Sequence, residues 1–564
     1  MPIVNLTEKN DTYRSSTTGS FTINGLGGDD YISITTSSFR GADLGDTLDG
    51  GDGNDQLRAS FTHDVLYGRA GNDKLMGGDG NDSMAGEDGD DLLDGGGGND
   101  VMLGGAGQDT LLGGFGNETL DGGEGNDLIS TSLGDHVVYG RGGDDVVAAS
   151  SGKDYVLGGD GNDELTLGSG NDFGDGEAGN DKIFAGAGDD TIVGGDGDDV
   201  LDGGDGVDSA RYDGAAAGVA VDLRVTVAQN TLGAGVDTLT SIEKLYGSAH
   251  NDTLTGNDLA NLLDGAEGAD ALFGMGGNDL LLGWGGNDSV SGGDGNDQID
   301  GGEGSDLLVG GAGTDTLLGG AGNDVINGDS GNDELATDGA DAIDGQAGDD
   351  VLLGRGGSDS LFGGDGNDQL SGGSGGDQLL GGAGNDTVDG GADNDSINGG
   401  SGTDRLLGDL GNDILETGGG LLDLVLGGAG DDRLVNTGGG NASADVLNDR
   451  SGYHNLLGEA GDDSFAILRG FSYIRDWQAG EEIAVDDLIL SGGFAPAVTL
   501  SSGGFLYARV FGGTVGADGR TTVSSITYVN TGVSASSANA VATANAVLND
   551  QIKPFDLIEY SPLG

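Results

Sequence analysis

From Gly41 to Arg211 the sequence repeats every nine residues without a slip of register, and the repeated unit reads Gly-Gly-x-Gly-x-Asp-x-(aliphatic)-x. Clear copies of this unit start at Gly77, Gly95, Gly104, Gly122, Gly158 and Gly194. With a period this short, each repeat packs mainly against neighbouring copies of itself. The chain is therefore expected to fold as a solenoid, in which one small unit is stacked many times.

The consensus indicates both a shape and a ligand. Positions one to six are expected to form a tight turn, because glycine accepts the positive φ values that other residues resist. The next three residues then form a short strand. Aspartate at position six and the exposed loop carbonyls offer oxygen ligands in a number that suits Ca²⁺. The aliphatic residue at position eight points inward to a thin core. The predicted core residues include Leu57, Leu75, Leu92, Leu111, Ile183, Ile192 and Leu201.

Over about three quarters of the chain, these repeats resemble those of the RTX (repeats-in-toxin) family, also called hemolysin-type calcium-binding repeat proteins. The chain is most similar to members built almost wholly of repeats, such as bacterial surface-layer, sheath and gliding-associated proteins. The resemblance implies an all-β fold, a parallel β-roll in which two nonapeptides make one right-handed turn. It also implies many Ca²⁺ ions, roughly one per loop, held between neighbouring loops of one edge.

By this resemblance, the position-six aspartates are the metal ligands. In the first array they are Asp55, Asp73, Asp82, Asp91, Asp100, Asp109, Asp127, Asp145, Asp154, Asp163, Asp172, Asp181, Asp190 and Asp199. In the second array they are Asp279, Asp288, Asp297, Asp306, Asp315, Asp324, Asp333, Asp350, Asp359, Asp368, Asp377, Asp386, Asp395, Asp404, Asp413, Asp432 and Asp463.

Some loops depart from the consensus. Glu118 and His136 occupy position six, and Leu133, Ser150 and Ser169 interrupt the glycine pattern, so weak or empty sites are expected there. For His136, an outward-facing or degenerate position is preferred over a ligand for another metal.

The repeats also indicate the domain organisation. We expect an N-terminal cap over residues 1–24, a first β-roll over 25–211, a structured β joint over 212–246, a second β-roll over 247–466 stacked with the first, and a small β-rich C-terminal unit over 467–564. The second array drops one residue within 337–344 and loosens after residue 416.

In the C-terminal unit, strands are predicted over residues 505–511 and 521–529, and an alanine-rich helix over 539–548. Residues 555–560 are interpreted either as part of a type I secretion signal or as an ordinary terminal strand.

The charge of the chain constrains its partners. It contains 98 acidic and 21 basic residues, a net charge of −77. Self-repulsion of this size should keep an ion-free chain expanded, so metal binding and folding are expected to be one event. The same field repels phosphate, which argues against a nucleic-acid partner.

The chain has no run of 18 apolar residues and no Sec-type signal pattern, so no membrane span is expected. The family resemblance instead implies export by the type I secretion machinery to an extracellular or cell-surface location. A chain with 0 cysteines suits such export, because no disulfide blocks passage in the unfolded state.

No catalytic residue is predicted. The histidines His63, His136, His250 and His454 lie far apart and none belongs to an HExxH motif. Ser374 lies in a G-x-S-x-G pattern, but that pattern is in register with the loops.

The preferred function is a non-enzymatic, secreted calcium-binding structural protein that folds on extracellular Ca²⁺ and polymerises with itself into a cell-surface layer, sheath or fibre. The alternatives are a calcium-dependent adhesin or biofilm matrix protein that binds a cell-surface glycan, a non-catalytic partner of a separately encoded toxin or enzyme, an uncharted activity of the C-terminal unit, and an ice-binding protein.

Overall fold

The computed structural model describes residues 3–16, 20–34, 45–329, 339–419 and 423–435, followed by the backbone of strands β48 (Val446–Asp449) to β57 (Ile526–Asn530). The described residues form strands and loops, with no helix among them. They belong to two compact units, Met1–Leu272 and Phe273–Gly564.

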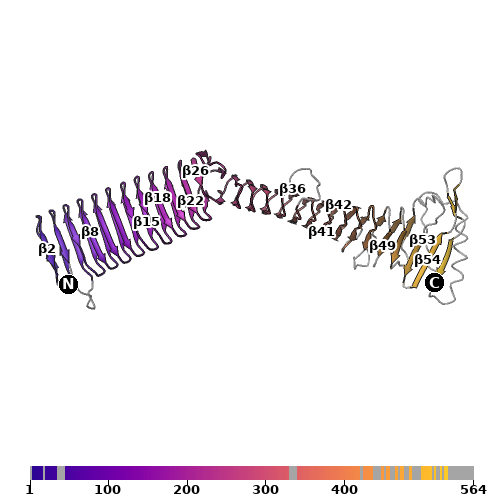
Figure 1. The fold of residues 1–564 in the computed structure, drawn as a ribbon, viewed down its shortest axis with the longest axis horizontal. Helices are drawn as coiled ribbons and strands as arrows, with labels where there is room; N and C mark the ends of the chain where they lie inside the picture. Colours follow the sequence, from indigo (N-terminus) through magenta and orange to yellow (C-terminus); the bar gives the residue numbers. More distant parts are fainter. Residues whose placement is uncertain are drawn as a thin grey trace. The chain divides into compact units, whose positions relative to one another are not determined.

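In the first unit, successive strands alternate between two parallel sheets, whose strands lie side by side in Figure 1. Within a sheet, Leu93 pairs with Leu111 and Leu111 with Ile129, so one turn of the solenoid consists of two nonapeptides, as predicted. The odd sheet contains β1 (Ile3–Asn5), β3 (Thr22–Asn24), β5 (Thr47–Asp52), β7 (Val65–Ala70), β9 (Ser83–Asp88), β11 (Val101–Ala106), β13 (Thr119–Glu124), β15 (Val137–Gly142), β17 (Tyr155–Asp160), β19 (Phe173–Ala178), β21 (Thr191–Val193), β23 (Ser209–Arg211), β27 (Lys244–Tyr246) and β29 (Leu262–Asp264). The even sheet contains β2 (Thr12–Ser15), β4 (Tyr31–Ile34), β6 (Gln56–Arg58), β8 (Lys74–Asp79), β10 (Leu92–Gly97), β12 (Thr110–Phe115), β14 (Leu128–Ser130), β16 (Val146–Ala148), β18 (Glu164–Ser169), β20 (Lys182–Ala187), β22 (Val200–Asp205) and β26 (Val236–Thr240).

The second unit has the same alternation. Its odd strands are β31 (Leu280–Leu282), β33 (Gln298–Glu303), β35 (Thr316–Ala321), β37 (Ala342–Ala347), β39 (Ser360–Asp365), β41 (Gln378–Ala383), β43 (Ser396–Ser401), β45 (Ile414–Glu416), β47 (Arg433–Val435), β49 (Tyr453–Leu457) and β51 (Phe471–Arg475). Its even strands are β32 (Ser289–Asp294), β34 (Leu307–Ala312), β36 (Val325–Asp329), β38 (Val351–Gly356), β40 (Gln369–Ser374), β42 (Thr387–Ala392), β44 (Arg405–Leu410), β46 (Leu424–Leu426), β48, β50 (Ser464–Ile467) and β52 (Glu482–Val485).

The regular strands are longer than the three residues that the repeat predicts. They contain six residues, from position seven of one repeat to position three of the next, as in β10. The pairing of β10 with β12 joins Asp94 to Leu112 and then Gly96 to Gly114, and thus passes over position one. Strand pairing therefore continues into the glycine-rich segment, with an interruption at its first residue.

The core is one inward-facing side chain wide at each strand. Leu57, Leu75 and Leu111 are fully buried, as predicted. The prediction for Leu92 is wrong, because Leu93 occupies position eight and is buried, whereas Leu92 faces outward and is only partly covered. Side chains alternate between the two faces of a strand, so a shift of one residue reverses the direction.

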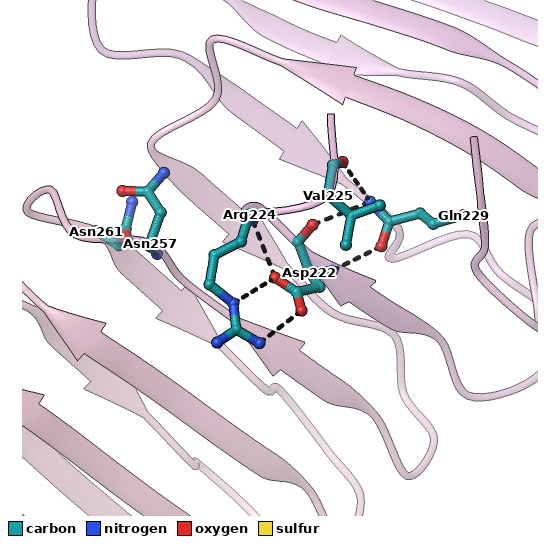
Figure 2. Close-up of polar contacts among 6 residues, drawn as sticks. All are labelled: Asp222, Arg224, Val225, Gln229, Asn257 and Asn261. Atoms are coloured by element: carbon teal, nitrogen blue, oxygen red, sulfur yellow. Dashed lines mark hydrogen bonds and ion pairs between the residues drawn. The ribbon is translucent and has the colours of Figure 1, made fainter. Parts of the chain in front are cut away.

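The segment between the arrays contains four strands. β26 and β27 continue the sheets of the first unit, and β24 (Ala220–Asp222) and β25 (Gln229–Asn230) form an insertion before them. β24 pairs with β28 (Thr253–Thr255). Figure 2 shows how side chains hold the turn after β24: Arg224 donates two hydrogen bonds to the Asp222 carboxylate, and the Gln229 amide bonds the Asp222 backbone.

The break in the nine-residue register within 337–344 lies in one turn of the solenoid that is longer than the others. Thr316 in β35 pairs with Ala342 in β37, and Val325 in β36 pairs with Val351 in β38. Both register steps measure 26 residues, where the regular turn has 18. The sheets thus absorb the irregularity in one loop, and Asp333 lies in residues 330–338, outside the described part of the chain.

In the C-terminal region, the predicted strands are confirmed. Residues 505–511 correspond to β54 (Gly504–Val510), and residues 521–529 to β56 (Thr521–Val523) and β57. β54 pairs antiparallel with β53 (Ala497–Ser502) and with β57, while β56 pairs with β55 (Gly513–Val515). The predicted helix over 539–548 and the segment 555–560 lie outside the described residues.

The thin core makes its side chains costly to remove. Leu111 and Leu112 are neighbours in β12, one fully buried and the other facing outward with 37% of its surface exposed. Leu111→Ala should destabilise the calcium-loaded protein by about 2–5 kcal/mol, because it leaves a cavity. Leu112→Ala is the matched control and should change stability by less than about 0.5 kcal/mol. Urea unfolding in saturating calcium measures both, and equal effects would contradict this description of the core.

Candidate calcium-binding loops

One carboxylate oxygen of each position-six aspartate fixes the register between turns. The backbone N–H of Asp55 donates to Oδ1 of Asp73 at 2.7 Å, and the N–H of Asp73 donates to Oδ1 of Asp91 at 2.7 Å. The same bond recurs in the second unit, for example from Asp297 to Asp315 at 2.9 Å. These aspartates are buried. Each turn is therefore pinned to the next by a side chain that lies beneath the loop.

The second oxygen, Oδ2, is buried and accepts no hydrogen bond within the described part of the chain. A buried charge without a partner is strongly unfavourable, so each of these atoms requires either a proton or a metal cation. In the first unit this holds for the predicted ligands Asp55, Asp73, Asp82, Asp91, Asp100, Asp109, Asp127, Asp145, Asp154, Asp163, Asp172, Asp181, Asp190 and Asp199. In the second unit it holds for Asp297, Asp306, Asp315, Asp324, Asp350, Asp359, Asp368, Asp377, Asp386 and Asp395.

The other predicted ligands of the second unit that are described also take their places in these columns. Hydrogen bonds join the ladder through Asp279, Asp288, Asp404, Asp413 and Asp432, all of them buried. Asp463 lies outside the described residues.

Carboxylate and carbonyl oxygens gather at position one. A Cβ placed on Gly301, at position one, would lie 2.5 Å from Oδ2 of Asp306 and 2.6 Å from the carbonyl oxygen of Gly319 in the next turn. A Cβ placed on Gly319 would lie 2.6 Å from Oδ2 of Asp324 and 2.8 Å from the carbonyl oxygen of Gly345. A carboxylate oxygen and a carbonyl oxygen thus lie close together at one glycine, and a hard cation beside them could take both as ligands.

The three glycines of the repeat serve different purposes. Positions two and four have positive φ, as in Gly78 (110°) and Gly80 (141°), which explains their preference for glycine. Gly77, at position one, does not have this conformation. A Cβ on Gly77 would instead collide with Oδ2 of Asp82. The first glycine is therefore required for space, not for the backbone angle that the sequence predicted for all three.

Burial of the column aspartates disfavours the ionised form of their carboxylates. Burial, with the charges of neighbouring aspartates, raises the pKa of Asp73 to about 7 and that of Asp163 to about 6. In the second unit, burial raises the pKa of Asp341 and of Asp395 to about 8. A cation that binds these groups must displace their protons, so calcium affinity should fall as the pH falls through this range.

Hydroxyl groups take the place of a cation in two loops near β24. Oδ2 of Asp237 accepts hydrogen bonds from Tyr212 Oη at 3.2 Å and from Thr231 Oγ1 at 3.0 Å. Oδ2 of Asp252 accepts from the backbone and the hydroxyl of Ser248. Because protein donors already satisfy these carboxylates, the structure can form there without metal.

Several aspartates of the columns were missed by the sequence prediction. Asp64, Asp208, Asp252 and Asp270 obey the nine-residue register, so the repeat itself could have found them. Asp341 lies nine residues before Asp350 and follows the register of the later repeats, but the step of 26 residues from Asp315 takes it out of the register of the earlier ones. The other missed members are Asp30, Asp46, Asp237 and Asp423.

The irregular pair Glu118 and His136 lies inside a column. Both side chains are 0% exposed, and His136 Nδ1 lies 2.5 Å from Glu118 Oε2. An outward-facing His136 is therefore wrong. The alternative of a degenerate loop position agrees with the bond from the His136 N–H to Asp154 Oδ1, at 2.8 Å. Burial opposes a charged imidazole, but the hydrogen bond and charge of Glu118 outweigh it and raise the His136 pKa.

The described residues hold no group of three or more His, Asp or Glu side chains that converges as a metal site. The loops instead combine one carboxylate with carbonyl oxygens. Ser374, from the G-x-S-x-G pattern, is the last residue of β40, at position three of the repeat whose position six is Asp377. No helix among the described residues is long and apolar enough to cross a membrane.

Comparison with known families agrees with this geometry. The model of the RTX calcium-binding nonapeptide repeat (4 copies) matches residues 40–75, 76–111, 112–147, 139–174, 175–210, 264–299, 300–335, 335–370, 371–406, 380–415 and 398–434, more than half of the chain. The chain belongs to the RTX calcium-binding repeat family. No curated protein matches the sequence. The matched segments contain the columns of buried aspartates, so the loops of this RTX protein are calcium-binding repeats.

The raised pKa values predict that the fold of the calcium-free protein is more stable at low pH than at high pH. Groups whose folded-state pKa exceeds the unfolded value of about 3.9 stabilise the fold at low pH, and this stability is lost as the pH rises through about 6–8. Circular dichroism without calcium should show more strand structure at about pH 4.5 than at about pH 8. The difference should persist at about 1 M salt, which screens exposed charges but not buried ones. More structure at the higher pH would contradict the assignment.

Asp163→Asn tests a single loop. Asparagine keeps an oxygen for the 2.7 Å bond from the Asp145 N–H but removes the charge beside Gly158. Calcium affinity at this loop should fall by about tenfold or more. The matched control is Asp160→Asn, which removes an exposed charge at position three of the same loop. Calcium titration followed by native mass spectrometry distinguishes them, and equal losses would exclude Asp163 as a ligand.

Proposed function

We propose that this protein is a secreted structural protein, which folds when it meets extracellular Ca²⁺ and then assembles into a cell-surface layer, sheath or fibre. The RTX repeats that cover more than half of the chain typify secreted proteins. The calcium-binding repeats make up the solenoid itself, so the metal is part of the architecture.

The observation that supports calcium-driven folding is the column of buried carboxylate oxygens without hydrogen-bond partners. At neutral pH, a net charge of −77 adds general repulsion to this local cost. Calcium offsets both, because each ion brings two positive charges to a loop that supplies one carboxylate. A chain of this kind remains unfolded until it reaches a calcium-rich compartment.

Support for assembly comes from the outer faces of the strands. Leu103 on β11, Leu128 on β14 and Tyr155 on β17 are more than 40% exposed, and Tyr155 stacks on Phe173 of the next odd strand at 4.8 Å. Apolar side chains on the outside of a regular solenoid offer contacts that repeat with the turns. Calcium would favour such contacts by neutralising the acidic loops between them.

Electron microscopy of the purified, chelator-treated protein tests this function. Ordered filaments, sheets or tubes should appear after addition of millimolar Ca²⁺ and not after Mg²⁺. A variant with Asp→Asn changes in consecutive loops, at Asp127, Asp145 and Asp163, should assemble less or not at all. Dispersed solenoids at saturating calcium would exclude self-assembly and favour an adhesive role, which binding to cell-surface glycans would then examine.

A further inference from the structure

One edge of the first unit departs from the glycine rule at position one. We call the loops from odd to even strands the odd-to-even edge, and the return loops the even-to-odd edge. On the odd-to-even edge, position one is glycine in every repeat from Gly50 to Gly194. On the even-to-odd edge, four consecutive turns have a side chain there, Thr131, Ala149, Leu167 and Ala185, and these residues are only 5, 4, 0 and 0% exposed.

A side chain at position one disturbs the oxygens that would hold the cation. In the glycine loop of Gly140, a Cβ would lie 2.4 Å from Asp145 Oδ2 and 2.4 Å from the carbonyl oxygen of Gly158. Carbon and oxygen atoms repel each other at such distances, so a loop with a side chain here must hold these two oxygens elsewhere. Ala149 and Ala185 carry such a Cβ in the loops that end at Asp154 and Asp190.

Leu167 shows that these side chains have a structural role of their own. Position eight of the same repeat is Gly174, which lacks the aliphatic core side chain of the other repeats. A Cβ placed on Gly174 would lie 2.9 Å from Leu167 Cδ1 and 3.2 Å from Ile183 Cγ2. Leu167 thus fills the part of the core that Gly174 leaves empty, and this buried apolar contact stabilises its turn.

The Glu118–His136 pair begins the same stretch. A Cβ on Gly113, at position one of that loop, would lie 3.5 Å from Glu118 Oε2, so this carboxylate is drawn away from the cation position. It contacts the His136 imidazole of the next turn instead. The loops that end at Glu118, His136, Asp154, Asp172 and Asp190 are therefore all altered, and they are consecutive on one edge.

We propose that these five loops form a seam in which side chains replace calcium, so that the first unit has a continuous calcium column on only one edge. This inference rests on the proposed calcium-dependent fold. Across the seam, each turn is fixed by cations at the odd-to-even edge and by packing at the even-to-odd edge.

The decisive experiment restores glycine at position one in two seam loops. In Ala149→Gly/Ala185→Gly, each loop regains a glycine beside a buried Oδ2 that accepts no hydrogen bond, at Asp154 and Asp190. Native mass spectrometry of the full chain at saturating Ca²⁺ should show about two more bound ions than in the wild type. The matched control is Ala148→Gly/Ala187→Gly, which removes methyl groups outside position one and should leave the ion count unchanged.

The opposite change provides a second measurement. Gly140→Ala places a methyl group at position one on the odd-to-even edge, where it would meet Asp145 Oδ2, and it should remove about one ion. Asp163→Asn gives the same readout without added bulk. An unchanged ion count in Ala149→Gly/Ala185→Gly, with normal calcium binding elsewhere, would overturn the seam. If the wild-type chain bound no calcium, the proposed function would fail instead.

Discussion

The fold depends on a buried carboxylate oxygen for which the described part of the chain provides no donor. Left charged and dry, each such oxygen costs several kcal/mol, and the columns repeat this cost at nearly every loop. Only a proton or a metal ion removes it. The raised pKa values and the affinity for calcium are therefore two consequences of one arrangement, and we expect the folded state only in solutions that supply one of the two cations.

The two oxygens of each aspartate divide the work between them. Oδ1 accepts a hydrogen bond from a backbone N–H of the preceding turn and sets the register, while Oδ2 is available to the cation. This division explains why aspartate is preferred at position six. The longer side chain of Glu118 places its carboxylate further from Gly113, the glycine at position one. That carboxylate contacts the imidazole of His136, the other departure from aspartate at position six. Asparagine would keep the register but would lose the charge.

Much of this architecture follows from the nine-residue period. The period itself predicts the short strands and the inward position eight, because these depend only on local spacing, and the family resemblance adds the parallel roll, the two-repeat turn and nearly all the column aspartates. What depends on three-dimensional register is not predicted. Asp341 joins a column through an enlarged turn, Leu92 faces outward because position eight is one residue further, and the strands extend into the glycines. The consensus also does not reveal that its first glycine is needed for space and the other two for backbone angle.

A solenoid can exchange calcium for packing over a few turns because its interactions are local. Each turn contacts its neighbours, so stability is approximately a sum of turn and interface contributions. A turn with a cation at only one edge keeps its strand register at both edges through the aspartate ladder. Oδ1 of Asp154 and of Asp172 still accepts its backbone hydrogen bond, although position one of these loops carries a side chain. The register and the metal are thus separable properties of the same side chain. The second unit keeps glycine at position one from Gly274 to Gly328 and again from Gly345 to Gly408. On both edges, these loops therefore lack the position-one side chains that mark the seam of the first unit, and we expect folding of the second unit to depend more completely on the cation.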